Sequence, residues 1–188
     1  MAIKPILFNT EMVRAILDWR KTCTRRILKG AIPFDEKAEH WNVLKKGEWS
    51  GPICVEYFMK QGSPYKPGDI LYVRETWKKA PNGYYYYEDW QKNDIADVTK
   101  WKPSIHMPKE AARIWLKVTD VRVERLQDMT DDDAEAEGCF DYTSTALGFP
   151  DVWDSTIKKS DLDRYGWAAN PWVWVIQFER CGKPESEG

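Results

Sequence analysis

The stretch Gly68-Asp-Ile-Leu-Tyr-Val-Arg-Glu-Thr-Trp77 decides the fold. β-Branched and aromatic residues fill its centre, and Pro67-Gly68 suits the two central positions of a type II turn. The pattern therefore predicts a strand over residues 69–77. Side chains alternate between the faces of a strand, and both faces begin apolar, which indicates burial on both sides. The expected faces are Leu71, Val73, Glu75 and Trp77 on one side, and Ile70, Tyr72, Arg74 and Thr76 on the other.

Glu75 follows two apolar residues toward the expected interior. An ionised carboxylate there is costly unless it meets a cation, so we expect either a raised pKa or a buried ion pair. A buried, perturbed carboxylate is a candidate for a functional site. The alternative is a purely structural salt bridge at the end of the strand, and periodicity by itself favours that alternative.

The rest of the chain predicts a mixed α+β fold, a small barrel or sheet with flanking short helices and long loops. Asn9 or Thr10 caps a first helix with an apolar stripe, and Thr130 caps a second helix that ends at Gly138. A third short helix is expected near 152–159. Further strands are expected at 4–8, 53–58, 84–87, 112–126 and 171–178.

Length and composition predict one domain over residues 1–180 with a frayed tail at 181–188. The chain has 188 residues, of which 43% are hydrophobic, and no apolar run approaches a membrane span. Its four cysteines form no CxxC pair, and its two histidines, His40 and His106, have no cysteine at ligand spacing. We therefore expect a cytoplasmic protein with no disulfides, no metal, no cofactor and no membrane partner.

The charges gather at two poles. Six cationic residues and one acidic residue lie between 14 and 29, whereas residues 128–141 hold seven acidic residues and no lysine or arginine. The basic pole suits a phosphate or another anion, although a solvated helix end explains it as well. The acidic pole is explained by a helix whose first turn is acidic, and we assign it no function.

The basic stretch contains a candidate nucleophile. Lys21 and Thr24 are three residues apart, so one helical turn or a tight loop brings both to one side. Neighbouring arginines would disfavour the ammonium form of Lys21 and lower its pKa, which is one route to a reactive lysine. A second basic and aromatic stretch, Lys100-Trp-Lys-Pro-Ser-Ile-His-Met-Pro108, suits a base-stacking groove, although a packed loop is the simpler interpretation.

Two motifs resemble a known family. Lys21-x-x-Thr24-x-Arg26, after an N-terminal strand and helix, is similar to the ASCH signature Gly-x-Lys-x-x-Thr-x-Arg. The turn and strand at 68–77, which end near an acidic residue, resemble the second hallmark of that family. The chain as a whole is most similar to the longer ASCH proteins of bacteriophages and prophages.

The resemblance implies a PUA-like fold with a cleft for RNA or a nucleoside. Compact bacterial members hydrolyse N4-acetylcytidine to cytidine and acetate, and another branch consists of ribonucleases. Their functional lysine, threonine, arginine and acidic residue correspond to Lys21, Thr24, Arg26 and Glu75. The resemblance predicts that Lys21 acts as nucleophile or base, that Glu75 carries the proton, and that Thr24 and Arg26 hold the oxyanion. The expected substrate-binding residues are Arg20, Arg25, Arg74, Trp77 and Trp19.

Two departures from the compact family pattern bear on function. Trp19 stands where the signature has glycine, so a positive φ there would strain the backbone, and the ring would fill or cover the cleft. The stretches 30–65, 78–110 and 139–170 are additions that would reshape access. The alternatives to hydrolysis are a non-catalytic module that binds RNA or a modified nucleotide, a ribonuclease, and a phage interaction protein that has lost activity.

Overall fold

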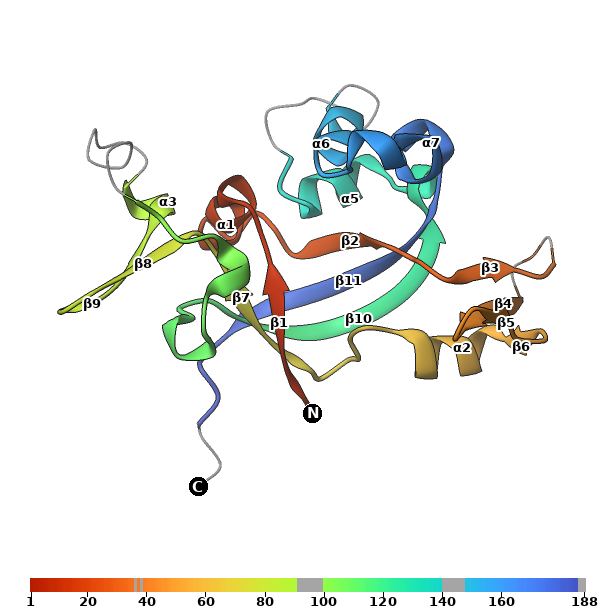
Figure 1. The fold of residues 1–188 in the computed structure, drawn as a ribbon, viewed down its shortest axis with the longest axis horizontal. Helices are drawn as coiled ribbons and strands as arrows, with labels where there is room; N and C mark the ends of the chain where they lie inside the picture. Colours follow the sequence, from red (N-terminus) through yellow and green to blue (C-terminus); the bar gives the residue numbers. More distant parts are fainter. Residues whose placement is uncertain (36, 38, 91–99, 140–147, 186–188) are drawn as a thin grey trace.

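The computed structural model describes residues 1–35, 37, 39–90, 100–139 and 148–185. Its main sheet has the strand order β1-β7-β10-β11-β2 (Figure 1). β1 runs parallel to β7, and the other neighbours are antiparallel. The bounds are β1 Ile3–Leu7, β7 Ile70–Arg74, β10 Trp115–Arg125, β11 Trp172–Cys181 and β2 Cys23–Ile27.

The predicted α+β class is confirmed, but the sheet does not close into a barrel. β1 and β2 are its two edges, and among the described residues no backbone ladder joins them. A side chain spans the gap instead, because a terminal guanidinium nitrogen of Arg26 on β2 donates to the carbonyl oxygen of Leu7 on β1 at 2.8 Å. The open gap between these edge strands is where the candidate site lies.

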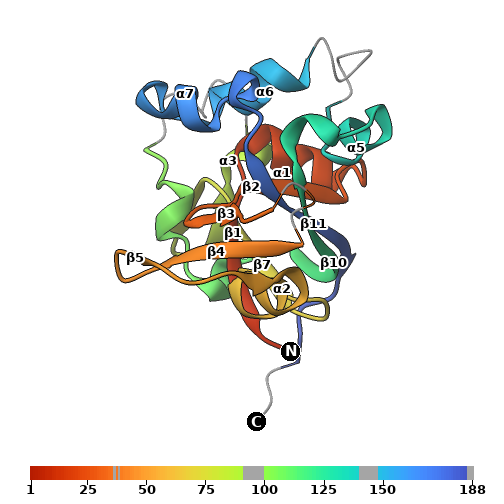
Figure 2. The ribbon, with the colours of Figure 1, turned by 90° about the vertical axis from the view of Figure 1, so that its right-hand side faces the viewer.

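Two smaller sheets lie at opposite ends of the molecule (Figure 1). One consists of short strands beside a helix, and Figure 2 shows this end of the molecule facing the viewer. Its elements are β3 Ala31–Pro33, β4 His40–Lys45, β5 Glu48–Trp49, β6 Ile53–Cys54 and α2 Val55–Gly62. The other is a hairpin of β8 Trp77–Ala80 and β9 Gly83–Tyr86, followed by α3 Tyr87–Trp90.

The strand predicted at 53–58 is wrong, since only Ile53 and Cys54 are extended. Apolar residues at 55, 58 and 59 recur at helical spacing, and the helix buries Phe58. The Phe58 ring stacks on Trp41 and on Trp174, with ring centroids 5.0 and 5.3 Å apart. A tertiary aromatic stack therefore outweighs the strand propensity of this segment.

The remaining helices cover the end of the sheet near β2. α1 Thr10–Leu17 begins at Asn9, whose side chain accepts from the Met12 amide as predicted. α5 Asp131–Ala136 begins with the predicted Thr130 cap, here a reciprocal capping box with Asp133. α6 Phe149–Ser155 and α7 Leu162–Tyr165 follow. Single 3-10 turns cover Ser104–His106, Lys109–Ala111, Leu126–Asp128, Lys159–Asp161 and Trp167–Ala169.

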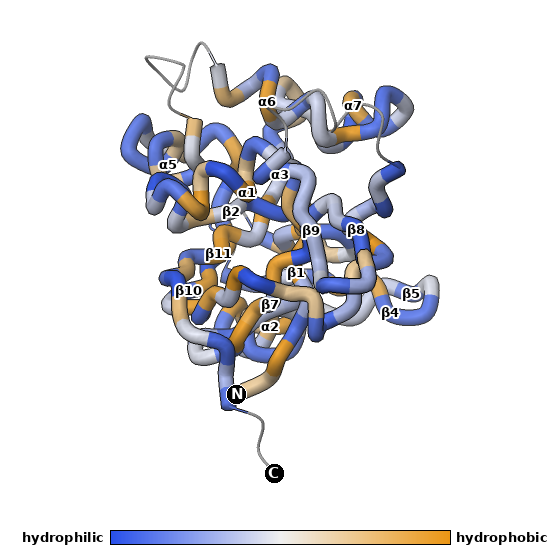
Figure 3. The backbone as a smooth tube through the Cα atoms, turned by 90° about the vertical axis from the view of Figure 1, so that its left-hand side faces the viewer, coloured by the Kyte–Doolittle hydropathy of each residue, from blue (hydrophilic) through white to orange (hydrophobic). Residues whose placement is uncertain are grey.

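The core divides along the faces of the main sheet. Leu71 and Val73 of β7 join the largest apolar cluster with Val13 and Ile16 of α1, whereas Ile70 and Tyr72 join another cluster, as the alternation predicts. Figure 3 shows apolar residues in β1 and β7 and also in the strands and helices around them. None of the described helices is long and apolar enough to cross a bilayer.

The last strand is longer than predicted. β11 continues through Cys181, which pairs with Trp115 of β10, so the expected tail begins only after that residue. The long strand predicted at 112–126 is a single strand from Trp115 to Arg125, and its register with β11 shifts between Val118 and Asp120. Residues 186–188 lie outside the described residues.

Candidate functional site

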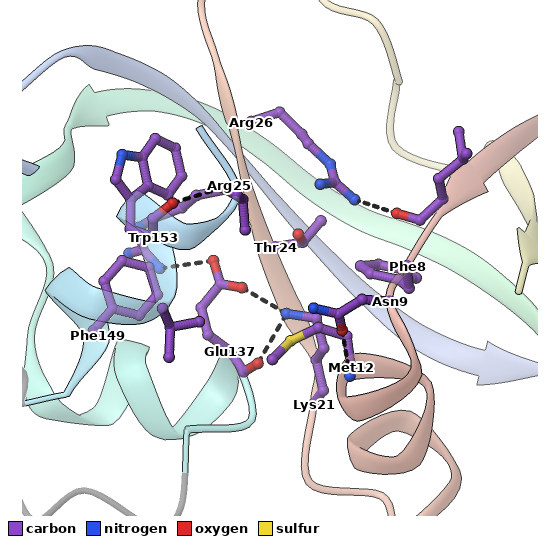
Figure 4. A pocket seen from close by; sticks show the side chains of 13 residues that line it. Phe8, Asn9, Met12, Lys21, Thr24, Arg25, Arg26, Glu137, Phe149 and Trp153 are labelled. Atoms are coloured by element: carbon purple, nitrogen blue, oxygen red, sulfur yellow. Dashed lines mark hydrogen bonds and ion pairs between the residues drawn. The ribbon is translucent and has the colours of Figure 1, made fainter. Parts of the chain in front are cut away.

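A cavity of about 150 Å³ lies between the edge strands β1 and β2 (Figure 4). The end of β1 and the start of α1 form one wall, and β2 forms the floor. The C-terminal end of α5 and the side chains of α6 complete the enclosure. The lining residues are Leu7, Phe8, Asn9, Met12, Lys21, Thr24, Arg25, Arg26, Glu137, Phe149, Val152, Trp153 and Thr156.

Lys21 enters this cavity from the loop between α1 and β2. The amides of Arg20 and Lys21 both donate to the carbonyl oxygen of Ala15, at 2.8 and 3.0 Å, which folds the loop back against the helix. The side chain is buried, and its Nζ lies 5.5 Å from the centre of the Phe8 ring. Its direction is therefore set by backbone hydrogen bonds and packing.

The acidic partner of Lys21 is Glu137, at the C-cap of α5. Lys21 Nζ donates to Glu137 Oε2 at 2.5 Å and to the Glu137 carbonyl oxygen at 2.9 Å. Both side chains are almost fully buried. Oxygen acceptors, and not the neighbouring arginines, therefore contact this amine, which corrects the expected environment of a lysine surrounded by guanidinium groups.

Gly138 gives α5 its close approach to the loop that carries Lys21. Its φ of +90° is left-handed, and a Cβ built there would lie 2.7 Å from Ala15 Cβ and 3.3 Å from Lys21 Cβ. Next to it, the Thr22 amide donates to the Ala136 carbonyl oxygen at 2.8 Å. The end of α5 is thereby held against the loop by one backbone hydrogen bond and by the close packing that Gly138 permits.

Arg25 extends the ion pair into a network. Its side chain is completely buried and contacts three carboxylates, those of Glu124 at 2.6 Å, Asp133 at 3.3 Å and Glu137 at 3.5 Å. Burial acts to lower the pKa of Arg25, but Glu137 and the other acidic groups outweigh burial and raise it. The expected basic pole and the acidic pole thus neutralise each other here, and the acidic segment that was given no function supplies Glu137.

Thr24 and Arg26 complete the polar lining. Thr24 is buried on β2. The Arg26 guanidinium lies 5.2 Å from the centre of the Phe8 ring, and burial lowers its pKa, although an arginine stays charged at neutral pH. No carboxylate of the described residues lies within ion-pair distance of Arg26. The charge of Arg26 is therefore available to a ligand, whereas the charges of Lys21 and Arg25 are already paired with carboxylates.

Glu75 is buried as predicted, but its carboxylate pairs with Arg113, whereas the amine of Lys21 pairs with Glu137. Its two carboxylate oxygens accept from Nε and one terminal nitrogen of Arg113, each at 2.9 Å. Arg113 also binds Asp89 at 2.8 Å and stacks on Tyr86. Burial raises the pKa of Glu75 despite this pairing. The structural ion pair is the interpretation that the contacts support, and Glu75 does not line the cavity.

Four of the five expected substrate-binding residues also lie outside the cavity lining, and only Arg25 belongs to it. Arg20 binds Asp18, and Arg74 donates to the Ile105 carbonyl oxygen. Trp19 has the left-handed φ of +62° that the glycine of the signature suggested, but its ring is 70% exposed and lies against Arg180. It neither fills nor covers the cavity.

Trp77 was expected on the same face as Leu71 and Val73. It packs instead with Ile70 and Tyr72. β7 ends at Arg74, and the chain bends before β8 begins at Trp77, so the alternation is interrupted at Glu75 and Thr76. A strand predicted as continuous over 69–77 is therefore two strands in different sheets.

Sequence reasoning missed Glu137, although one signal pointed to it. A segment with seven acidic residues and no cation needs positive partners, and residues 14–29 carry the matching excess of positive charge.

Within the described part of the chain, no group of histidine, cysteine or carboxylate side chains is arranged to hold a metal ion. His40 contacts Asp35 through Nδ1 at 2.9 Å on the surface.

Comparison with known proteins gives similarity in structure only. No family model and no curated protein matches the sequence. The fold is similar to that of an ASCH domain. That structure, from Lactobacillus crispatus JV V101, is 12% identical, with a TM-score of 0.47 over 95% of this chain and 79% of the other. A hypothetical protein, PH0355, is 15% identical, with a TM-score of 0.39 over 96% and 100% of the two chains. We base no function on either likeness.

Proposed function

We propose that this chain belongs to the ASCH family, binds the base of a modified nucleoside in the cavity between β1 and β2, and hydrolyses an amide on that base. The observation that carries the proposal is the buried ion pair of Lys21 and Glu137 in the lining of a small, partly aromatic cavity. The signature residues Lys21, Thr24 and Arg26 all contribute to that lining.

The size and lining of the cavity suit a single six-membered ring. An apolar cavity of about 150 Å³ holds a benzene molecule in an engineered protein. Here the volume is similar, and the rings of Phe8, Phe149 and Trp153 line it together with polar groups. A pyrimidine offers aromatic faces for such rings and polar edges for donors and acceptors, so it fits better than an extended or purely apolar ligand.

The ion pair provides an acid and a base for amide hydrolysis. Glu137 takes a proton from a water molecule whose oxygen bonds to the amide carbon, and Lys21 gives a proton to the leaving nitrogen as the carbon–nitrogen bond breaks. Transfer of the proton from Glu137 to Lys21 then restores both groups. One water is consumed, and an amine and a carboxylic acid are released. Glu137 thus carries the proton in place of Glu75, and Lys21 acts as the acid in place of the nucleophile or base that the resemblance implies.

The neighbouring groups suit the charge that develops in this step. The Thr24 hydroxyl and the Arg26 guanidinium are donors for the oxyanion of the tetrahedral intermediate. Arg25 holds Glu137 from the side away from Lys21, at 3.5 Å, which restricts the rotation of the carboxylate. Arg25 is therefore a positioning residue in this scheme.

Incubation with N4-acetylcytidine tests the proposal by the mass change to cytidine. We expect turnover by the unchanged protein and a loss of at least about 100-fold in kcat for Lys21→Met and for Glu137→Gln. Glu135→Gln, an exposed carboxylate on the same helix, serves as the matched control. Absence of turnover in the unchanged protein refutes hydrolysis of this substrate, and full activity of folded Glu137→Gln refutes its role.

Binding without turnover is the second candidate function. The observation that favours it is the Arg26 guanidinium, which lacks a carboxylate partner among the described residues and suits a phosphate of RNA or of a modified nucleotide. Affinity that depends on phosphate contacts falls steeply with salt, whereas nucleoside hydrolysis does not. Calorimetric titration of cytidine and its monophosphate at two salt concentrations separates the two functions.

A further inference from the structure

The β8–β9 hairpin has two faces with different surroundings. Cross-strand pairing places Trp77 opposite Tyr86, and Lys79 opposite Tyr84, on one face. Trp77, Tyr84 and Tyr86 pack in the apolar cluster of Ile70 and Tyr72. This face attaches the hairpin to the body, and the hairpin projects beyond the end of the main sheet (Figure 1).

The opposite face carries aromatic residues that belong to none of the core clusters of the described residues. Lys78 pairs with Tyr85, and the Tyr87 amide donates to the Thr76 carbonyl oxygen, so Tyr85 and Tyr87 share this side. Both tyrosines are half-buried. Their edge-on partners are Trp90, whose ring centroid is 6.0 Å from that of Tyr85, and Trp101, whose centroid is 5.5 Å from that of Tyr87.

The charges around these rings favour an anion. Lys78 is half-exposed and Lys100 is exposed, and no carboxylate of the described residues lies within ion-pair distance of either. The two acidic residues of α3 are neutralised by arginines of the body, because Glu88 binds Arg14 at 2.7 Å and Asp89 binds Arg113 at 2.8 Å. Among the described residues, Lys78 and Lys100 thus have no carboxylate partner, whereas Lys21 and Arg25 at the cavity are both paired with carboxylates.

We infer that this face, formed by Lys78, Tyr85, Tyr87, Trp90 and Trp101, with Lys100 next to Trp101 in the chain, binds single-stranded nucleic acid. Unpaired bases present aromatic faces that stack on tyrosine and tryptophan, and lysine attracts the phosphates between them. In a duplex the base faces stack on one another, so only the phosphates remain accessible, and they contact the lysines but not the rings. The inference concerns a surface separate from the cavity and does not depend on hydrolysis there.

Fluorescence anisotropy with labelled oligothymidine and oligouridine of about 15 nucleotides tests the inference on the full chain. We expect binding that weakens between about 0.05 M and 0.2 M salt and is stronger for single strands than for a duplex of equal length. Tyr85→Ala and Trp101→Ala should each weaken binding about 5- to 100-fold. Trp49→Ala, which removes an exposed tryptophan from the opposite end of the molecule, should leave binding unchanged.

Lys78→Glu combined with Lys100→Glu provides a variant that removes no packed ring. It should weaken binding at low salt at least as much as either aromatic variant, and its folding is checked by circular dichroism. Any of three results overturns the inference: no oligonucleotide binding at low salt, equal affinity for the duplex, or unchanged affinity of the lysine double variant. The first of these leaves a protein partner as the alternative occupant.

Discussion

Glu137 and Lys21 form a buried ion pair at 2.5 Å although 116 residues separate them in the chain. The pair joins a helix cap to the loop that carries the ASCH-like motif. Arg25 links it to Glu124 and Asp133, so charges from β2, β10 and α5 balance in the interior. Removing one partner of such a pair leaves the other buried without compensation.

Glu137→Gln should therefore destabilise the protein by about 3 kcal/mol at neutral pH, because Lys21 and Arg25 lose a common counter-ion. Urea unfolding monitored by circular dichroism measures this change. The control Glu135→Gln should alter the free energy of unfolding by less than about 0.5 kcal/mol, since surface substitutions rarely do more. A cost for Glu137→Gln no larger than that of the control would contradict the assignment of a buried pair.

Glu75→Gln tests whether the buried carboxylate of Glu75, unlike that of Glu137, contributes to stability alone and not to the cavity. It should lower the free energy of unfolding by about 3 kcal/mol, because Arg113 loses its buried partner. Binding of a nucleoside in the cavity should remain within about twofold of the unchanged protein, because Glu75 is absent from the lining. Calorimetry measures the affinity, and a loss of binding in a folded variant would restore Glu75 to the site.

Asp69 gives a prediction for pH dependence. Burial acts to raise its pKa, but hydrogen bonds from Lys4 and from the amides of Ala2 and Lys66 outweigh burial and lower it. A lowered pKa in the folded state stabilises the protein above the unfolded value near 3.8 and loses this effect as the pH falls. Asp69→Asn should therefore cost about 1–3 kcal/mol at pH 7 and clearly less near pH 3.

Urea unfolding at both pH values measures the effect of Asp69→Asn. Asp120→Asn is the matched control, because the Asp120 side chain is about half exposed and reaches Arg122 only at 4.0 Å. An equal cost of Asp69→Asn at the two pH values would show that its ionised form contributes nothing.

Gly138→Ala should disturb the approach of α5 to the loop that carries Lys21. The added methyl group would lie 2.7 Å from Ala15 Cβ, and alanine is also strained at a φ of +90°. Gly47 has nearly the same φ, +89°, but no atom within 4 Å of its built Cβ. Gly47→Ala therefore measures backbone strain alone, and Gly138→Ala should cost at least about 2 kcal/mol more in thermal unfolding. Equal costs would exclude the steric contribution.

Trp19→Gly tests the departure from the ASCH signature. Relief of the left-handed strain should raise the free energy of unfolding by about 1 kcal/mol. The loss of the contact between the Trp19 ring and Arg180 offsets part of this gain. Trp19→Ala loses the same ring without gaining the conformational freedom of glycine, so it should be the less stable of the two variants. Neither change should alter nucleoside affinity, and a gain in affinity would show that Trp19 restricts the cavity.

The sequence by itself determined the local elements whose signals lie within a few residues. The Asn9 and Thr130 caps and the turn at Pro67-Gly68 followed from short-range chemistry, and Gly68 has the expected left-handed φ of +87°. The burial of Glu75 also followed, since Leu71 and Val73 before it are apolar. The three named residues of the motif Lys21-x-x-Thr24-x-Arg26 all line one cavity.

Only the tertiary structure decided which charges meet. The spacing of the acidic residues in α5 does not indicate which basic segment they contact. The position of α5 against β2 depends on the close packing of Gly138 on Ala15. The partner of Glu75 depended likewise on where Arg113 lies before β10. Ion pairs between distant segments leave no periodic trace in a sequence, because they depend on how packed elements dock and not on the residues beside them.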